Sequence, residues 1–222
     1  MGHISIIAKG IRKQDAGLCH LQEYELHLLE PKEEGLYLLK DFQEQRDYSI
    51  YPTAATWAAA DCGAELLMHL IIPAYEAGAY YELLCNYLGY LQKVDANAVL
   101  ILWRLFMRVY ANLGLAPKLG VCAVCNEATE IAGYSRDMEL SCQNCLCAEG
   151  AHYFSPLARR ILALLPEIGN HLQDLILDRA VVQELNTYFT NYFYAHYHKT
   201  LRLKSLSVLC QFYPVIKTAR NY

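Results

Sequence analysis

The chain has 222 residues, enough for one large domain or for two to three small ones, each with a buried hydrophobic core. Apolar residues make up 55% of the sequence and charged residues 19%, so the composition excludes an intrinsically disordered or collagen-like chain. The formal net charge of -4 excludes a protein that is basic throughout, so a nucleic-acid contact would need a local basic surface.

The first 48 residues predict a small antiparallel sheet. Tyr24, Leu26 and Leu28 alternate with the polar residues between them, a period of two that places the apolar set on one face of a strand. The turn-rich segment 31–35 is followed by an apolar run over 36–39. We therefore expect a hairpin in this part of the chain.

After Pro52 the sequence predicts long helices. Thr53 and Asp95 are the expected N-caps of the first and third helices, and Ser155 with Pro156 predicts another helix start. The expected helices span 53–72, 74–91, 96–113, 155–165, 178–198 and 203–212. The fold class that follows is α+β. The expected domains are a sheet domain over 1–48, a helical domain over 49–117 and 153–222, and a ribbon inserted at 118–152.

Four cysteines have the spacing of a metal site. Cys122 and Cys125 form one C-x2-C pair, Cys142 and Cys145 form a second, and sixteen residues separate the pairs. This is the two-knuckle arrangement of a zinc ribbon. Four thiolates fill a tetrahedral Zn²⁺ shell, so we expect a structural and not a catalytic zinc. Cys147 offers a second register in place of Cys145; equal spacing of the two pairs favours Cys142 and Cys145.

Basic residues gather near both ends of the chain. Residues 1–13 carry Lys9, Arg12 and Lys13 and contain no acidic residue, and residues 185–222 contain no acidic residue either. Within the second segment, Lys199, Arg202 and Lys204 could extend a track of phosphate contacts. The alternative interpretation is that both ends are simply solvated surface.

Two helical patterns have more than one interpretation. Aromatic residues recur at four-residue spacing over 188–197, which favours core packing over a base-stacking platform. Arg104 and Arg108 share one face of an apolar helix, where they could reach the surface or bind an acidic peptide tail.

Signatures of enzymes and of membrane proteins are missing from the sequence. It contains no phosphate-binding loop, nucleophile elbow or H-E-x-x-H motif, so we expect no enzymatic activity. The apolar stretch 99–115 is interrupted by two arginines, and the first residues do not form a secretory signal. We therefore expect a cytoplasmic protein without a membrane partner.

Three segments resemble the RecO family of bacterial recombination mediators. The segment Ile7–Lys13 is similar to the basic strand end of that family's amino-terminal OB-fold. The segment Leu113–Pro117, which leads to Cys122, is similar to its helix-to-zinc junction. His198 with the 203–205 Leu-Lys-Ser segment is similar to its carboxy-terminal signature.

The resemblance implies an OB-fold, a helical body and a zinc module. It also implies single-stranded DNA binding and annealing, association with RecR and with the acidic tail of single-stranded DNA-binding protein, and indirect assistance to RecA. The family has a first barrel strand ahead of the position of Gly2, which this chain lacks, so we expect an open sheet edge. The competing hypothesis is a zinc-containing protein-interaction scaffold that binds no DNA, which suits the acidic middle of the chain.

Overall fold

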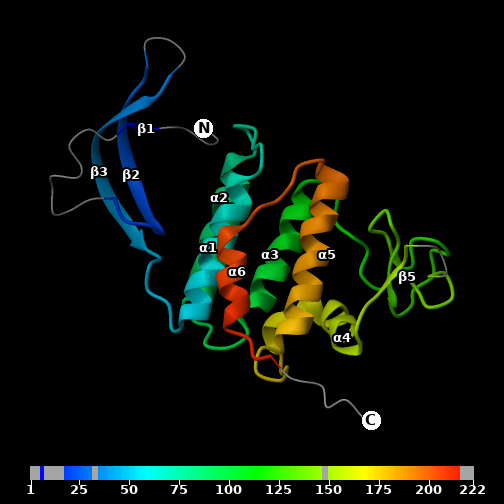
Figure 1. Cartoon of the computed structure of the whole chain (residues 1–222). Helices are drawn as coiled ribbons and strands as arrows, with labels where there is room; N and C mark the ends of the chain where they lie inside the picture. Colours follow the sequence, from blue (N-terminus) through cyan, green and yellow to red (C-terminus); the bar gives the residue numbers. More distant parts are fainter. Residues whose placement is uncertain (1–5, 8–17, 32–34, 147–149, 216–222) are drawn as a thin grey trace. The chain divides into compact units, whose positions relative to one another are not determined.

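The computed structural model describes residues 6–7, 18–31, 35–146 and 150–215, and the fold is α+β (Figure 1). The chain divides into two compact units, Met1–Val94 and Asp95–Tyr222. We call them the N-terminal and C-terminal units. This division groups the first two helices with the sheet, whereas the sequence grouped them with the later helices. The domain boundaries expected from the sequence stay a prediction.

A three-stranded sheet begins the N-terminal unit. Its strands are β1 at Ile6–Ile7, β2 at Gln22–Leu29 and β3 at Tyr37–Asp47, in the order β1-β3-β2. Strands β2 and β3 pair antiparallel, from Gln22 opposite Asp47 to Leu29 opposite Leu38, which confirms the hairpin. Strand β1 pairs with β3 in parallel, so the sheet is mixed and not purely antiparallel. The OB-fold stays a prediction, and β2 is an edge strand of the described sheet.

Two antiparallel helices complete the N-terminal unit, α1 at Ala54–Met68 and α2 at Ala77–Leu91. Thr53 caps α1 as expected: its hydroxyl accepts a hydrogen bond from the Thr56 N–H while the Thr56 hydroxyl accepts one from the Thr53 N–H. Alanines of α1 are buried and allow α2 to approach closely, so that the Tyr87 hydroxyl donates to the Ala59 carbonyl at 2.5 Å.

The C-terminal unit is built around α3, Ala98–Asn112, whose side chains are buried on nearly all sides. This confirms the apolar stretch as a core helix. Among the described residues, no helix combines the length and apolar character needed to cross a bilayer. The other helices of the unit are α4 at Pro156–Leu164, the 3-10 helix η2 at Leu165–Asn170, α5 at Arg179–Tyr197 and α6 at Lys204–Gln211.

The prediction of Asp95 as the N-cap of α3 was wrong, because the N-cap lies two residues later, at Asn97. The helix begins after Asn97, which has a left-handed backbone with φ of 51°. The Asn97 amide does not cap the helix but donates to the carbonyls of Leu172 and Leu175, at 2.8 and 2.7 Å. Asp95 instead accepts from Gln173 at 2.8 Å. The long-range hydrogen bonds of Asn97 therefore determine where α3 starts.

In contrast, Ser155 caps α4 as expected, with Pro156 as the first residue of that helix.

Aromatic side chains from α3 and α5 form the centre of the C-terminal unit. Trp103 is fully buried, and its Nε1 donates to the Asn186 Oδ1 at 2.8 Å. The Tyr110 hydroxyl donates to the Phe189 carbonyl at 2.5 Å. Four of the five residues predicted as a buried stripe, Tyr188, Phe189, Tyr192 and Phe193, are buried, and the fifth, Tyr197, is half-buried. The core interpretation of that stripe is therefore confirmed.

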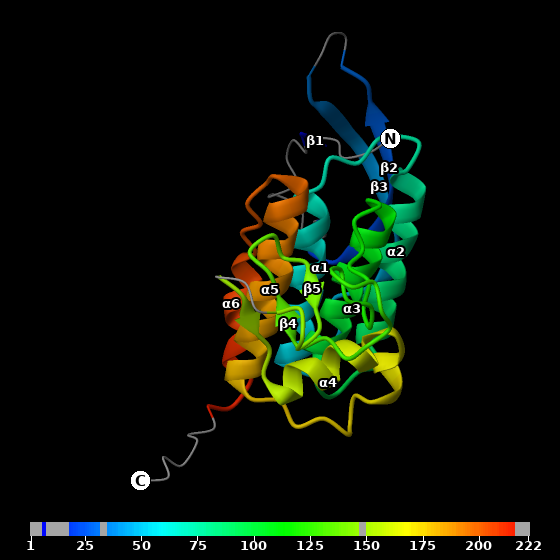
Figure 2. The same cartoon turned by 90° about the vertical axis from the view of Figure 1, so that its right-hand side faces the viewer.

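The cysteine-rich segment forms a small sheet against α5 (Figures 1 and 2). Its strands are β4 at Gly133–Tyr134, β5 at Leu140–Ser141 and β6 at His152–Tyr153, with β4 in the centre and both pairings antiparallel. We call residues 118–153 the ribbon. Tyr134 and the neighbouring Phe154 contact the ring of Tyr188 on α5, with centroids 5.1 and 5.3 Å away.

Gly133 is required where β4 passes between its neighbours. A Cβ at this position would lie 2.0 Å from the His152 carbonyl oxygen and 2.5 Å from a Leu146 methyl group. We expect Gly133→Ala to destabilise the ribbon by about 1–3 kcal/mol, because backbone atoms must move to admit the methyl group. Faster limited proteolysis within 118–153 would report this. The matched control is Gly78→Ala, since a Cβ at Gly78 meets nothing within 4 Å. Equal proteolysis of the two variants would contradict the prediction.

Candidate metal centre and basic surface

The four predicted ligands come together in the ribbon. The sulfur atoms of Cys122, Cys125, Cys142 and Cys145 all lie within 4.8 Å of one another. Cys122 and Cys142 are buried, Cys145 is half-buried and Cys125 is exposed. The cluster therefore lies at the edge of the ribbon, with two thiols facing the interior. Cys147, the alternative ligand, lies outside the described residues.

Backbone hydrogen bonds shape both turns of the cluster. In the first turn, the Asn126 N–H donates to the Cys122 carbonyl at 2.9 Å, and Asn126 has a φ of 58° in the left-handed region. In the second, the N–H groups of Cys145 and Leu146 donate to the Cys142 carbonyl at 3.2 and 3.0 Å. Each turn directs its two sulfurs to one side, which is the arrangement expected from C-x2-C spacing.

The environment of the sulfurs separates their pKa values. Burial by itself would raise the pKa of Cys122, but N–H groups of Cys125, Cys142 and Val124 donate to its sulfur, and the pKa is lowered to about 6. The pKa of Cys145 is raised to about 12, first because it shares a hydrogen bond with the Cys142 sulfur and then by burial. Four close thiols cannot all ionise without a cation, so one thiolate is stabilised at the expense of its neighbours.

This donor set fits a tetrahedral ion with soft-ligand chemistry. The four sulfurs, all within 4.8 Å of one another, would hold a Zn²⁺ ion, which binds cysteine thiolates in tetrahedral sites. All four ligands are thiolates, so a bound ion would have no open position for a substrate. The cluster is therefore suited to holding the ribbon together and not to catalysis.

The predicted basic residues divide into two groups. Lys9, Arg12 and Lys13 lie outside the described residues. Lys199, Arg202 and Lys204 are exposed and lie in or next to the connection between α5 and α6. Leu201 and Leu203 alternate with Arg202 and Lys204 and are buried. This connection therefore directs its apolar side chains inward and its cations outward. Among the described residues, no carboxylate forms an ion pair with Arg202 or Lys204.

Arg104 and Arg108 border an apolar cavity of about 230 Å³. Met107, Leu119 and Leu165 supply apolar surface, together with Pro166. Neither arginine forms an ion pair within the described part of the chain. An apolar cavity flanked by two guanidinium groups is suited to a peptide that combines acidic and apolar side chains.

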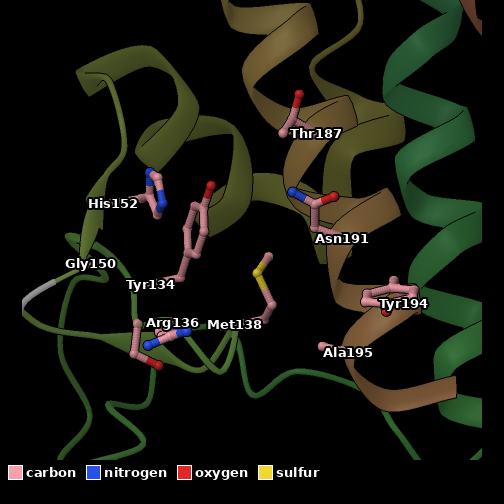
Figure 3. A pocket seen from close by; sticks show the side chains of 10 residues that line it. Tyr134, Arg136, Met138, Gly150, His152, Thr187, Asn191, Tyr194 and Ala195 are labelled. Carbon is pink, nitrogen blue, oxygen red and sulfur yellow. The ribbon is translucent and has the colours of Figure 1, made fainter. Parts of the chain in front are cut away.

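The sequence did not predict a cavity of about 780 Å³ between the ribbon and α5 (Figure 3). We call it the ribbon groove. The helical wall comes from residues at positions 187, 191, 194 and 195, which share one face of α5 opposite the buried aromatic stripe. The only signal in the sequence was this helical spacing of polar residues and a tyrosine, which is equally typical of solvated surface.

Comparison with known proteins identifies one family. The family model described as "Recombination protein O C terminal" matches residues 52–207. The match includes five of the six described α-helices in full, the ribbon and the four clustered cysteines. No curated protein matches the chain in sequence.

Proposed function

The chain belongs to the RecO family of recombination and DNA-repair proteins, and from this premise we propose that it binds and anneals single-stranded DNA and assists RecA loading with RecR. The activity is non-enzymatic and takes place in the cytoplasm. The family match over residues 52–207 is the observation that carries the proposal. The amino-terminal OB-fold expected from the resemblance would provide part of the DNA-binding surface.

The four-cysteine cluster supports a structural Zn²⁺ site in this function. Cys122, Cys125, Cys142 and Cys145 would hold the ion, whose positive charge would stabilise all four thiolates. The strands of the ribbon have only two residues each, so hydrogen bonding alone gives little stability. Metal binding would supply folding free energy to this segment.

An annealing assay tests the proposed activity directly. Complementary strands coated with single-stranded DNA-binding protein are mixed with and without the full chain, and duplex formation is followed over time. We expect the chain to accelerate annealing. The protein-interaction scaffold would be supported instead if the chain did not accelerate annealing, bound no oligonucleotide at any salt concentration and still captured RecR.

Salt dependence should reveal the phosphate contacts. Binding of a fluorescent oligonucleotide should weaken steeply with salt, because each neutralised phosphate releases counterions. We expect Arg202→Ala/Lys204→Ala and Arg12→Ala/Lys13→Ala each to reduce the salt slope by about one to two counterions, measured by fluorescence anisotropy. The matched control is Lys118→Ala/Arg160→Ala, which removes two exposed cations from the same unit as Arg202. If a double variant keeps the slope of the unmodified chain, that pair is solvated surface.

The cavity beside Arg104 and Arg108 supports binding of the acidic tail of single-stranded DNA-binding protein. The apolar lining would receive apolar side chains of the tail while the two guanidinium groups contact its carboxylates. We expect Arg104→Ala/Arg108→Ala to weaken binding of a tail peptide about tenfold, since two exposed ion pairs are together worth about 1–1.5 kcal/mol. Calorimetry measures the affinity. A peptide with its acidic residues changed to amides is the control, and equal binding of both peptides would contradict this assignment.

A further inference from the structure

The ribbon groove brings two separate segments of the C-terminal unit to one cavity (Figure 3). The ribbon provides Tyr134, Arg136, Met138 and His152, and α5 provides Thr187, Asn191 and Tyr194. The contacts of Tyr134 and Phe154 with Tyr188 keep the ribbon against α5. The groove therefore exists only while the ribbon is folded.

Flat rings line both sides of the groove. On the ribbon side, Tyr134 and His152 are stacked, with centroids 5.0 Å apart and planes inclined by 17°. On the helical side, Tyr194 is 59% exposed and supplies a second ring. The buried Met138 adds a polarisable surface between the two sides (Figure 3). Such surfaces bind flat π-systems through stacking.

Two polar groups of the groove have hydrogen-bonding capacity to spare. Arg136 is exposed, and among the described residues no carboxylate pairs with its guanidinium. Asn191 is exposed one turn before Tyr194, and within the described part of the chain no hydrogen bond occupies its side-chain amide. An amide offers both donors and acceptors, which complements the edge of an unpaired nucleobase. A free guanidinium complements a phosphate.

We propose that the ribbon groove binds an unpaired nucleotide of single-stranded DNA. The base stacks on Tyr194 or His152, the Asn191 amide bonds to the base edge, and Arg136 contacts a neighbouring phosphate. Bases within a duplex are stacked and paired, so the groove selects single strands. The cavity volume of about 780 Å³ lies in the range of about 300–1,000 Å³ typical of ligand sites.

This inference rests on the proposed function and adds a role for the ribbon. Two of the three aromatic or guanidinium groups that would contact DNA, Arg136 and His152, belong to the ribbon, so loss of the metal would remove one wall of the site. A peptide is the less favoured occupant, because the groove presents exposed rings and an amide and not a continuous apolar surface.

The test combines photo-crosslinking with affinity measurements on the full chain. The probe is a fluorescent oligothymidine containing 5-iodouracil, which crosslinks to nearby aromatic side chains on irradiation. We expect crosslinks to Tyr194 or His152, located by mass spectrometry of the digested protein. We also expect Tyr194→Ala to weaken binding about fivefold or more, since one stacked base is worth about 1–3 kcal/mol. Arg136→Ala should reduce the salt slope by about one counterion.

Matched variants separate this site from general effects. Tyr75→Ala removes an exposed tyrosine from the other unit, and Arg160→Ala removes an exposed arginine from α4; both should bind as the unmodified chain does. Oligonucleotide binding with crosslinks only elsewhere and no effect of Tyr194→Ala would overturn the groove and leave the proposed function standing. Absence of any oligonucleotide binding would overturn both. If Tyr194→Ala weakened only the binding of an acidic tail peptide, the groove would be a peptide site and the inference wrong.

Discussion

Replacing Cys122 with serine is expected to abolish stoichiometric zinc binding and to unfold the ribbon. Cys122 is buried, and its sulfur accepts several backbone N–H groups, so serine cannot replace the thiolate without loss of a strong ligand. Structural zinc sites contribute about 10–16 kcal/mol of binding free energy to folding. Metal analysis of the purified protein should fall from one zinc ion per chain to none, and protease should cleave within 118–153.

Two other cysteines provide controls for this result. Cys19 is exposed and outside the cluster, so Cys19→Ser should keep one zinc ion and an intact ribbon. Cys147→Ser should also keep the metal; its loss would assign Cys147 as a ligand in place of Cys145. A Cys122→Ser variant with one bound zinc and normal protease resistance would contradict the four-cysteine site.

A large loss of stability is also expected from Trp103→Ala in the centre of the C-terminal unit. The indole is fully buried, lies nearly parallel to the Phe189 ring and donates to Asn186. Its removal leaves a large cavity and an unpaired buried carbonyl, at a cost of about 3–5 kcal/mol in the free energy of unfolding. Folded domains are stable by about 5–15 kcal/mol, so this variant should unfold at much lower urea concentration, followed by circular dichroism.

The second tryptophan of the chain is the matched control. Trp57 is 43% exposed on α1, so Trp57→Ala should change the stability by less than about 1 kcal/mol. The stability of Trp103→Phe should lie between those of Trp103→Ala and Trp57→Ala, because phenylalanine keeps most of the ring volume and still leaves Asn186 without its donor. Equal stability of Trp103→Ala and Trp57→Ala would contradict the core assignment.

These two predictions concern different sources of stability within one unit. The Trp103 core depends on aromatic packing between α3 and α5, whereas the ribbon depends on the cysteine cluster. Tyr188 contacts both, since its ring touches Phe189 in the core and Tyr134 in the ribbon. Loss of the metal should therefore leave the helices folded but remove the ribbon-side cover of Tyr188. The ribbon groove would be lost with it.

Features that depend on neighbouring residues could be predicted from the sequence alone. Thr53 and Ser155 cap helices because their hydroxyls reach N–H groups only three residues away. The alternation around Leu26 predicted β2 because side chains of a strand point to opposite faces. The cysteine spacing predicted that four sulfurs would meet because each C-x2-C turn directs two of them to one side.

Tertiary contacts alone decided the features that join distant segments. The start of α3 follows from hydrogen bonds between Asn97 and carbonyls more than seventy residues away, at Leu172 and Leu175. The parallel pairing of β1 with β3 and the addition of β6 to the ribbon also bring together residues far apart in the chain. The ribbon groove arises only where the ribbon packs on α5. A local pattern carries no information about such partners, because their separation in space is set by the packing of the whole unit.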